Sequence, residues 1–357
     1  MTLEHGWTKA WYSLVVAALL AANLFVGTTA ASPLSGQEPD EEWEINFSGN
    51  GIKIFDIYET DEGYTLIGTK NKKQAYLVRT DAAGNVVWEK VLDLRTSDHH
   101  QVIITAAYYT DEGGYLLGGT VPGYESYYYI ARTDEDGVVV WDKEKFNQDY
   151  VEFEDLRETK DGGMIYSYNS GQSTSYIVKL DATGAHQWQN ELTMTKYDPH
   201  VAIESIHQTA DGGYIAGAFR SGAYILWKLN ASGQSEWINS HGDGIGWVVP
   251  TSNNGFAIIN YDRWLNRSVL FVTNHNGQSY LSKDLGINGT ARSIELSPEG
   301  GYLIGLSNAV IACDAQGNVL WSKPVSQLTK ALPTRDGGVV YLTSYEKVIK
   351  LAAESAH

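Results

Sequence analysis

Aspartate and histidine recur together in the middle of the chain, and both residue types can do chemistry. Carboxylate and imidazole groups that meet at one point can bind a divalent cation or transfer protons. The chain has no short metal-ligand motif such as H-E-x-x-H, and local capping of loops accounts for the aspartates without a ligand. We therefore predict no metal site and keep these residues as candidate ligand contacts. They are Asp98, Asp149, Asp198 and Asp243, accompanied by His99, His100, His200 and His241.

A second group of residues combines aromatic rings with guanidinium groups. A sugar or an extended peptide can stack on such rings, and arginine can bind its polar groups. The alternative for the tyrosine-rich stretch YESYYY (124–129) is that its rings pack inside the fold. The candidate ligand contacts of this kind are Tyr124, Tyr127, Arg220, Arg263 and Trp264.

Two turn signatures alternate along the chain and define the elements that must position these residues. TADGGY (209–214) represents the first signature, and LDATGAHQW (180–188) represents the second. Asp or Asn followed by Gly bonds its own turn backbone and tolerates positive φ, so each signature predicts a tight hairpin. The segments between turns are short and alternate apolar with polar residues, which indicates an antiparallel meander.

Seven such units follow one another, and each has room for four short strands. In the fourth unit we expect strands at 202–209, 214–219, 223–229 and 235–241. A four-stranded sheet cannot bury both of its faces alone, and repeats of roughly 45 residues are typical of propeller blades. We therefore predict an all-β fold, a seven-bladed β-propeller with four-stranded antiparallel blades.

Most units carry a tryptophan four residues after the glycine of the second turn. A large aromatic side chain at a fixed place in every repeat indicates packing between blades rather than contact with a ligand. In the fifth unit a leucine takes this position. The residues of this structural repeat are Trp43, Trp88, Trp141, Trp188, Trp237, Leu281 and Trp321.

The seventh unit ends one strand short, before any tryptophan. The segment EEWEINF (41–47) resembles the missing last strand but lies at the other end of the chain. We predict that the strand 41–47 completes the C-terminal blade and closes the ring, so that no blade keeps an open edge. The propeller would then comprise residues 41–357.

The repeat also resembles a known family. The pattern Y-x-x-K-x-D-x-x-G-x-x-x-W, present in YIVKLDATGAHQW (176–188), resembles the tryptophan-docking repeat of quinoprotein-like propellers. The DGGY turns look like those of secreted or surface propeller proteins of microbes, especially archaea. This resemblance covers residues 41–357 and implies the fold. The quinone-dependent enzymes of that superfamily use eight blades and a vicinal disulfide, whereas this chain has seven units and one cysteine, so we expect no cofactor.

The N-terminal residues are predicted to direct export. Lys9 precedes an apolar run and GTTAAS (27–32) offers small residues for cleavage, so residues 1–31 are interpreted as a signal peptide and 32–40 as a flexible leader. A retained N-terminal anchor is the alternative. After cleavage we expect no membrane span. The formal net charge of −17 argues against nucleic acid as a partner, because the two would repel each other.

The loops of a blade indicate where a ligand would bind. The connections between second and third strands and the crossings to the next blade emerge on one face, which we call the loop-rich face. Its irregular loops make it the expected ligand face. We predict a secreted or cell-surface, monomeric and non-enzymatic module that binds a glycan, peptide or protein there. The alternatives are a hydrolase or lyase acting on polysaccharide at the channel mouth and a structural component of the cell envelope.

Overall fold

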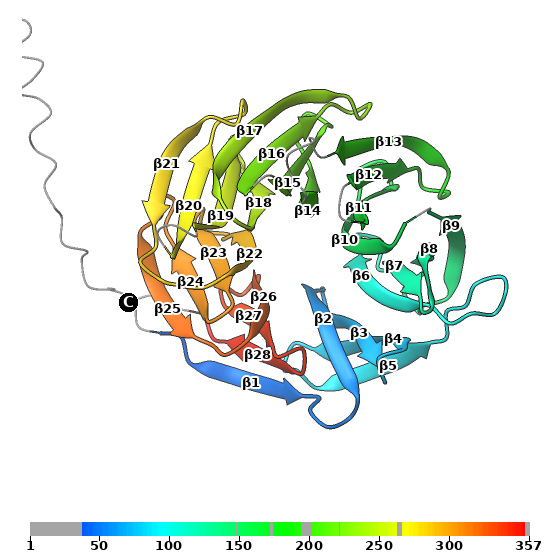
Figure 1. Cartoon of the computed structure of the whole chain (residues 1–357). Helices are drawn as coiled ribbons and strands as arrows, with labels where there is room; N and C mark the ends of the chain where they lie inside the picture. Colours follow the sequence, from blue (N-terminus) through cyan, green and yellow to red (C-terminus); the bar gives the residue numbers. More distant parts are fainter. Residues whose placement is uncertain are drawn as a thin grey trace, which may run out of the picture. The chain divides into compact units, whose positions relative to one another are not determined.

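The computed structural model describes residues 38–353, except 148, 172–173, 194–200, 221 and 263–265. The regular secondary structure of these residues consists of β-strands. The strands form seven four-stranded antiparallel sheets around a central channel (Figure 1). The predicted all-β, seven-bladed propeller is confirmed. Among the described residues no helix is long and apolar enough to cross a membrane. The predicted signal peptide lies outside the described residues.

The strands of each blade follow one another from the channel outward (Figure 1). The innermost strands are β2 (Ile52–Glu59), β6 (Ile103–Tyr109), β10 (Val151–Glu158), β14 (Val201–Gln208), β18 (Gly246–Pro250), β22 (Ala291–Leu296) and β26 (Leu328–Pro333). The second strands are β3 (Gly63–Lys70), β7 (Tyr115–Val121), β11 (Met164–Ser170), β15 (Tyr214–Arg220), β19 (Phe256–Asp262), β23 (Tyr302–Leu306) and β27 (Val339–Thr343). The third strands are β4 (Gln74–Asp81), β8 (Tyr124–Thr133), β12 (Thr174–Leu180), β16 (Ala223–Leu229), β20 (Arg267–Thr273), β24 (Ala309–Cys313) and β28 (Lys347–Leu351). The outermost strands are β5 (Val86–Leu92), β9 (Val139–Phe146), β13 (His186–Thr193), β17 (Ser235–Asp243), β21 (Ser279–Asp284), β25 (Val319–Pro324) and β1 (Glu41–Asn46).

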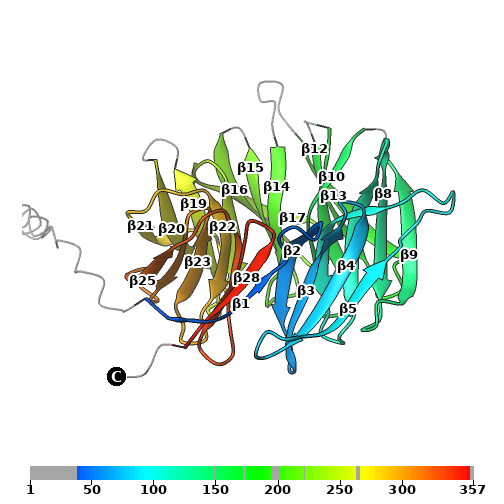
Figure 2. The same ribbon diagram turned by 90° about the horizontal axis from the view of Figure 1, so that it is seen from below.

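The outermost strand of the last blade comes from the start of the propeller. β1 pairs antiparallel with β28, with Trp43 opposite Lys350 and Asn46 opposite Lys347 (Figure 2). The Ala352 amide donates to the Asp40 carbonyl at 2.9 Å and extends this pairing by one further bond. The two ends of the propeller therefore lie in one sheet.

The buried core lies between neighbouring blades rather than inside one of them. One apolar cluster joins Leu77 of β4 to Leu117 of β7, and another joins Leu270 of β20 to Ile304 of β23. All four side chains are fully buried. Side chains alternate between the two faces of each sheet, and each face packs on one neighbouring blade. Both faces are therefore covered only because the blades form a ring.

Four of the repeated tryptophans, namely Trp43, Trp141, Trp188 and Trp237, contact the turn of the following blade. The Trp141 indole donates to the Ala182 carbonyl at 3.0 Å, and Trp43 makes the same bond to Ala82 at 3.1 Å. Gly184, at φ 76°, lies against the Trp141 ring, and a Cβ there would come within 2.9 Å of it. The turn glycine thus provides both the left-handed backbone and the space for the ring.

Three lysines of the third strands are buried and pair with aspartates of the first turns. The Lys179 ammonium lies 2.8 Å from Asp161, which also accepts bonds from the Thr159 hydroxyl and the Gly163 amide. The lysine of the Y-x-x-K repeat therefore fastens the first turn of its own blade. The three pairs are Lys179 with Asp161, Lys228 with Asp211, and Lys350 with Asp336.

These turn aspartates should make the fold sensitive to acid. Burial favours the neutral form, but hydrogen bonds and the lysine lower the pKa of Asp211 and Asp336 to about 2. The unfolded value is about 3.9, so their stabilisation is present above about pH 4 and is lost as pH falls toward 2. Replacing Asp161, Asp211 and Asp336 together by Asn should flatten the fall of unfolding free energy between pH 5 and 2. Urea unfolding at a series of pH values measures this, and an unchanged slope would contradict it.

Removing β1 should destabilise the whole propeller. Deletion of residues 38–47 leaves β28 with an unpaired edge and takes Glu42 away from the buried Lys350 ammonium, which lies 3.2 Å from it. We expect a lower melting temperature and aggregation, measured by calorimetry and light scattering. Glu44→Ala is the control, because it keeps the β1 backbone and should change stability by less than about 1 kcal/mol. A deletion variant that melts like the full chain would refute this prediction.

Candidate binding site at the channel mouth

The innermost strands of all seven blades line a cavity of about 280 Å³ in the channel. Because these strands start at the loop-rich face and run away from it, their early residues lie at the mouth and their later residues lie deeper. Tyr345, in the loop between β27 and β28, also reaches the cavity and is 47% exposed. The cavity therefore opens toward the face with the irregular loops.

A β-bulge recurs in six of the seven innermost strands and determines which side chains enter the mouth. In β10, for example, Phe153 and Asp155 pair with consecutive residues of β11, and Glu154 is left unpaired between them. A bulge re-aims the extra residue, here toward the channel. The unpaired residues are Phe55, Thr105, Glu154, Glu204, Arg292 and Thr329.

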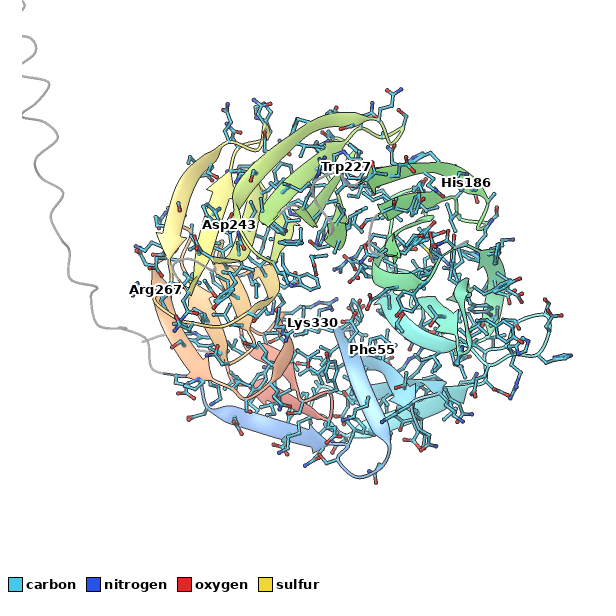
Figure 3. The ribbon with its side chains drawn as sticks, viewed as in Figure 1. Phe55, His186, Trp227, Asp243, Arg267 and Lys330 are labelled. Atoms are coloured by element: carbon cyan, nitrogen blue, oxygen red, sulfur yellow. The ribbon has the colours of Figure 1, made fainter. Side chains whose placement is uncertain are left out.

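Deeper in the channel, Lys330 connects the last blade to the first. Its ammonium pairs with Asp56 and lies 4.7 Å from the centre of the Tyr58 ring. The Tyr58 hydroxyl donates to Asp56 at 2.6 Å, and burial together with this carboxylate raises the pKa of Tyr58 well above its ordinary value. Figure 3 shows Lys330 and Phe55 at the central opening between the blades.

Arg157 makes the second ion pair at this depth. Its guanidinium lies 3.2 Å from Asp155 and 5.6 Å from the centre of the Tyr108 ring. Asp155 also accepts a bond from the Ile206 amide of the next blade at 3.0 Å. Burial, with Arg157 nearby, lowers the pKa of His207 far below its ordinary value, so this imidazole is neutral at pH 7. The deep network comprises Asp56, Tyr58, Tyr108, Asp155, Arg157, His207, Glu295 and Lys330.

Two carboxyl groups of the bulges have a different environment, and of these Glu154 lines the cavity. Burial and repulsion from Glu204 raise the pKa of Glu154 to about 9, although Asn169 donates to it at 2.5 Å. Burial and repulsion from Glu152 raise the pKa of Glu204 to about 7, and Arg292 opposes this shift. Neither carboxyl group forms an ion pair with a described residue. At neutral pH Glu154 is therefore largely protonated and Glu204 is protonated in about half of the molecules.

The mouth combines the Glu154 carboxyl group with aromatic surface. Phe55, Trp247 and Tyr345 line the same cavity as Glu154 and Arg292. Rings with a few convergent polar groups are typical of ligand pockets. In the described part of the chain no group of three His, Cys, Asp or Glu side chains is placed to hold a metal ion.

Most of the residues selected from the sequence lie away from this cavity. The rings of His100 and Tyr124 contact each other at a tilt, with centroids 4.6 Å apart, and those of Tyr127 and Phe146 are 5.0 Å apart. Together these side chains form an exposed aromatic row on the second blade. Asp98 and His99 belong to the same loop as His100. None of these residues lines the channel cavity.

The other selected residues lie farther around the ring. His241 is buried on β17, where its Nδ1 lies 3.1 Å from the Ser279 hydroxyl, and Asp243 ends the same strand. Asp149 lies beside Gly171, and Arg220 ends β15. None of the described aspartates and histidines among these residues lines the cavity. Asp198, His200, Arg263 and Trp264 lie outside the described residues.

Sequence reasoning missed the residues that do line the channel. A signal was present: FEDLRE (153–158) and IESIHQ (203–208) carry several charges inside segments that the repeat assigns to innermost strands. A charge on a strand that is surrounded by other strands needs a partner or a ligand. What the sequence does not show is the bulge, which decides which of the charges faces the channel.

The fold is shared with several solved structures. Virginiamycin B lyase from Staphylococcus aureus, a catalytically inactive variant with quinupristin, is 12% identical, with a TM-score of 0.61 over 87% of this chain and 98% of that one. BamB from Moraxella catarrhalis is 12% identical, with a TM-score of 0.55 over 88% and 100%. YCF48 bound to D1 peptide is 10% identical, with a TM-score of 0.58 over 90% and 99%.

At these identities the likeness shows the β-propeller fold alone. No family model matches the chain. No curated protein matches it either. The resemblance to quinoprotein-like repeats therefore stays a prediction.

The ion pair between the last and first blades should be energetically coupled. Replacing Lys330 by Met leaves the Asp56 carboxylate without its cation in a partly buried site, whereas Asp56→Asn in the same chain removes the unpaired charge. A double-mutant cycle on urea unfolding should give a coupling energy of about 1–2 kcal/mol. The exposed pair of Arg267 and Asp284, at 2.8 Å, is the control and should give less than about 1 kcal/mol. Additive effects at Lys330 and Asp56 would rule out the coupling.

Proposed function

We propose that the protein is a non-catalytic binding module that holds a segment of a peptide, protein or glycan ligand at the channel mouth. The observation that carries this proposal is the cavity itself. It opens to the loop-rich face, and Phe55, Trp247 and Tyr345 line it together with polar groups. Aromatic faces next to hydrogen-bonding groups suit an extended chain that inserts one residue into the cavity.

The aromatic row on the second blade would extend the binding face. Tyr124, Tyr127 and Phe146 are 50%, 41% and 64% exposed, and their rings contact one another in sequence. Exposed rings in contact form an apolar surface that a partner can cover. A ligand that inserts one residue into the mouth and extends across the loop-rich face could reach this row.

The export signal predicted at residues 1–31 supports a role outside the cytoplasm, and we propose a secreted or cell-surface protein that acts as a monomer. Two of the similar structures fit a binding role in their own right, because YCF48 holds a peptide and virginiamycin B lyase holds quinupristin. These ligands belong to those proteins and support only the general use of the fold as a binding scaffold.

A hydrolase or lyase is the second candidate, and one observation favours it. Glu154 and Glu204 both have raised pKa values, about 9 and about 7, and a carboxyl group held protonated at neutral pH can act as a general acid. Polysaccharide incubated with the protein would then be cleaved, and Glu154→Gln together with Glu204→Gln would abolish cleavage. Binding without turnover favours the module.

The test of the binding module is a screen of glycan and peptide arrays followed by affinity measurements. Trp247→Ala and Tyr345→Ala should each weaken the identified ligand about tenfold or more, as expected when an aromatic contact in a binding site is lost. Tyr280→Ala is the control, because Tyr280 is 62% exposed on the outer strand β21 and does not line the cavity. Equal affinity of the Trp247 and Tyr345 variants and the unaltered protein would refute binding at the mouth.

A further inference from the structure

The chain contains four Asn-x-Ser/Thr triplets, the acceptor pattern of N-glycosylation. All four lie within the described residues and begin at Asn46, Asn230, Asn266 and Asn288. Transfer of a glycan needs an accessible asparagine side chain and the hydroxyl group two residues later. The hydrogen bonds of the fold therefore indicate which triplet the folded chain leaves available.

The triplet at Asn230 is used by a hairpin turn. The side-chain oxygen of Asn230 accepts bonds from the Ser232 hydroxyl at 2.8 Å and from the Ser232 and Gln234 amides at 3.0 and 2.9 Å. Asn230 is only partly exposed. Its side chain and the Ser232 hydroxyl therefore shape the turn between β16 and β17, which accounts for both residues without a glycan.

The triplets at Asn46 and Asn266 are also engaged in the fold. The Asn46 side-chain oxygen accepts a bond from the Ser48 amide at 2.9 Å, and the Ser48 hydroxyl forms a hydrogen bond that lowers the pKa of Glu346. The Asn266 side-chain oxygen accepts a bond from a tyrosine hydroxyl. Ser268, the hydroxyl residue of that triplet, is fully buried and donates to a backbone carbonyl at 2.7 Å.

The triplet at Asn288 differs from the other three. It lies in the crossing between β21 and β22, and Asn288 is exposed. Among the described residues neither the Asn288 side chain nor the Thr290 hydroxyl has a hydrogen-bond partner. The backbone is held, because the Asn308 side chain donates to the Asn288 carbonyl at 2.6 Å and the Thr290 amide donates to the Ser307 hydroxyl at 3.1 Å.

The middle residue of this triplet has a structural reason that its two neighbours lack. A Cβ at Gly289 would come within 2.3 Å of the Asn308 side-chain oxygen, so the close approach of these segments requires glycine. No contact of the fold requires the amide of Asn288 or the hydroxyl of Thr290 in the same way. These are the two groups that an N-glycosylation acceptor must present.

Resting on the proposed location outside the cytoplasm, we infer that Asn288 carries an N-linked glycan. The co-substrate is an oligosaccharide attached to a lipid through a phosphate or pyrophosphate group. The Asn288 Nδ2 forms a bond to the anomeric carbon and loses one proton. The bond between that carbon and the phosphate oxygen breaks, and the lipid phosphate leaves with the electron pair. Asn288 does not line the channel cavity, so the glycan leaves the channel mouth open.

Peptide mass spectrometry of the exported full chain, isolated from its native host, tests the inference. We expect a sugar mass on the peptide that contains Asn288 and none on the peptides that contain Asn46, Asn230 and Asn266. An exported chain with unmodified Asn288 would overturn the inference and leave the proposed binding function standing. A chain found only in the cytoplasm would overturn the inference together with the proposed location.

Variants of the triplet separate glycosylation from other changes at Asn288. Asn288→Gln and Thr290→Ala should each abolish the sugar mass, whereas Thr290→Ser should retain it. Because neither side chain is hydrogen bonded in the fold, all three variants should stay folded, which circular dichroism checks. A modification that persists in Thr290→Ala, such as deamidation of the Asn-Gly bond, would overturn the inference.

Asn230→Gln is the matched control. It removes a triplet whose side chain holds a turn, so it should lower the melting temperature and leave the sugar mass on Asn288 unchanged. A sugar mass that is lost in Asn230→Gln but kept in Asn288→Gln would refute the inference, because the glycan would then lie on the turn.

Discussion

Each blade must bury both faces of a four-stranded sheet, and the rest of the structure depends on this requirement. A sheet with two apolar faces is stable only between two neighbours, so the blades form a closed ring. The junction of the first and last blades is packed like the others, with Ile54 of β2 and Val340 of β27 in one buried cluster. Because β1 comes from the start of the propeller, the strands at its two ends hold each other in place.

The same packing decides where polar groups can lie. In the turns between innermost and second strands the aspartates are half exposed, and the buried lysines of the third strands reach them. At the channel, seven strands converge, and in six of them a bulge leaves one residue unpaired. Asp155 and Ser293 each accept a backbone amide of the next innermost strand, at 3.0 and 3.3 Å, so polar side chains also join the blades there.

The sequence was sufficient for the fold because each blade repeats the same local chemistry. Turn glycines, alternating strands and the tryptophans around Trp141 and Trp188 are visible one repeat at a time, and counting them gives seven blades. The candidate site was not predictable in this way. Glu154 and Glu204 lie about 50 residues apart in the chain, and their proximity depends on ring geometry and on the bulges. The loop residues Asp98 and His100 looked more reactive, yet their loop begins at an outer strand.

The deep network and the mouth differ in what the fold alone explains. Asp56, Lys330, Asp155 and Arg157 compensate one another across the blades, so a structural role accounts for them. A network of this kind could have continued to the mouth, since Arg292 lies in the strand two blades from Glu204. Its guanidinium instead forms no ion pair with a described residue. Packing and mutual compensation therefore account for the inner half of the channel, whereas at the outer half Arg292 only opposes the raised pKa of Glu204 from a distance.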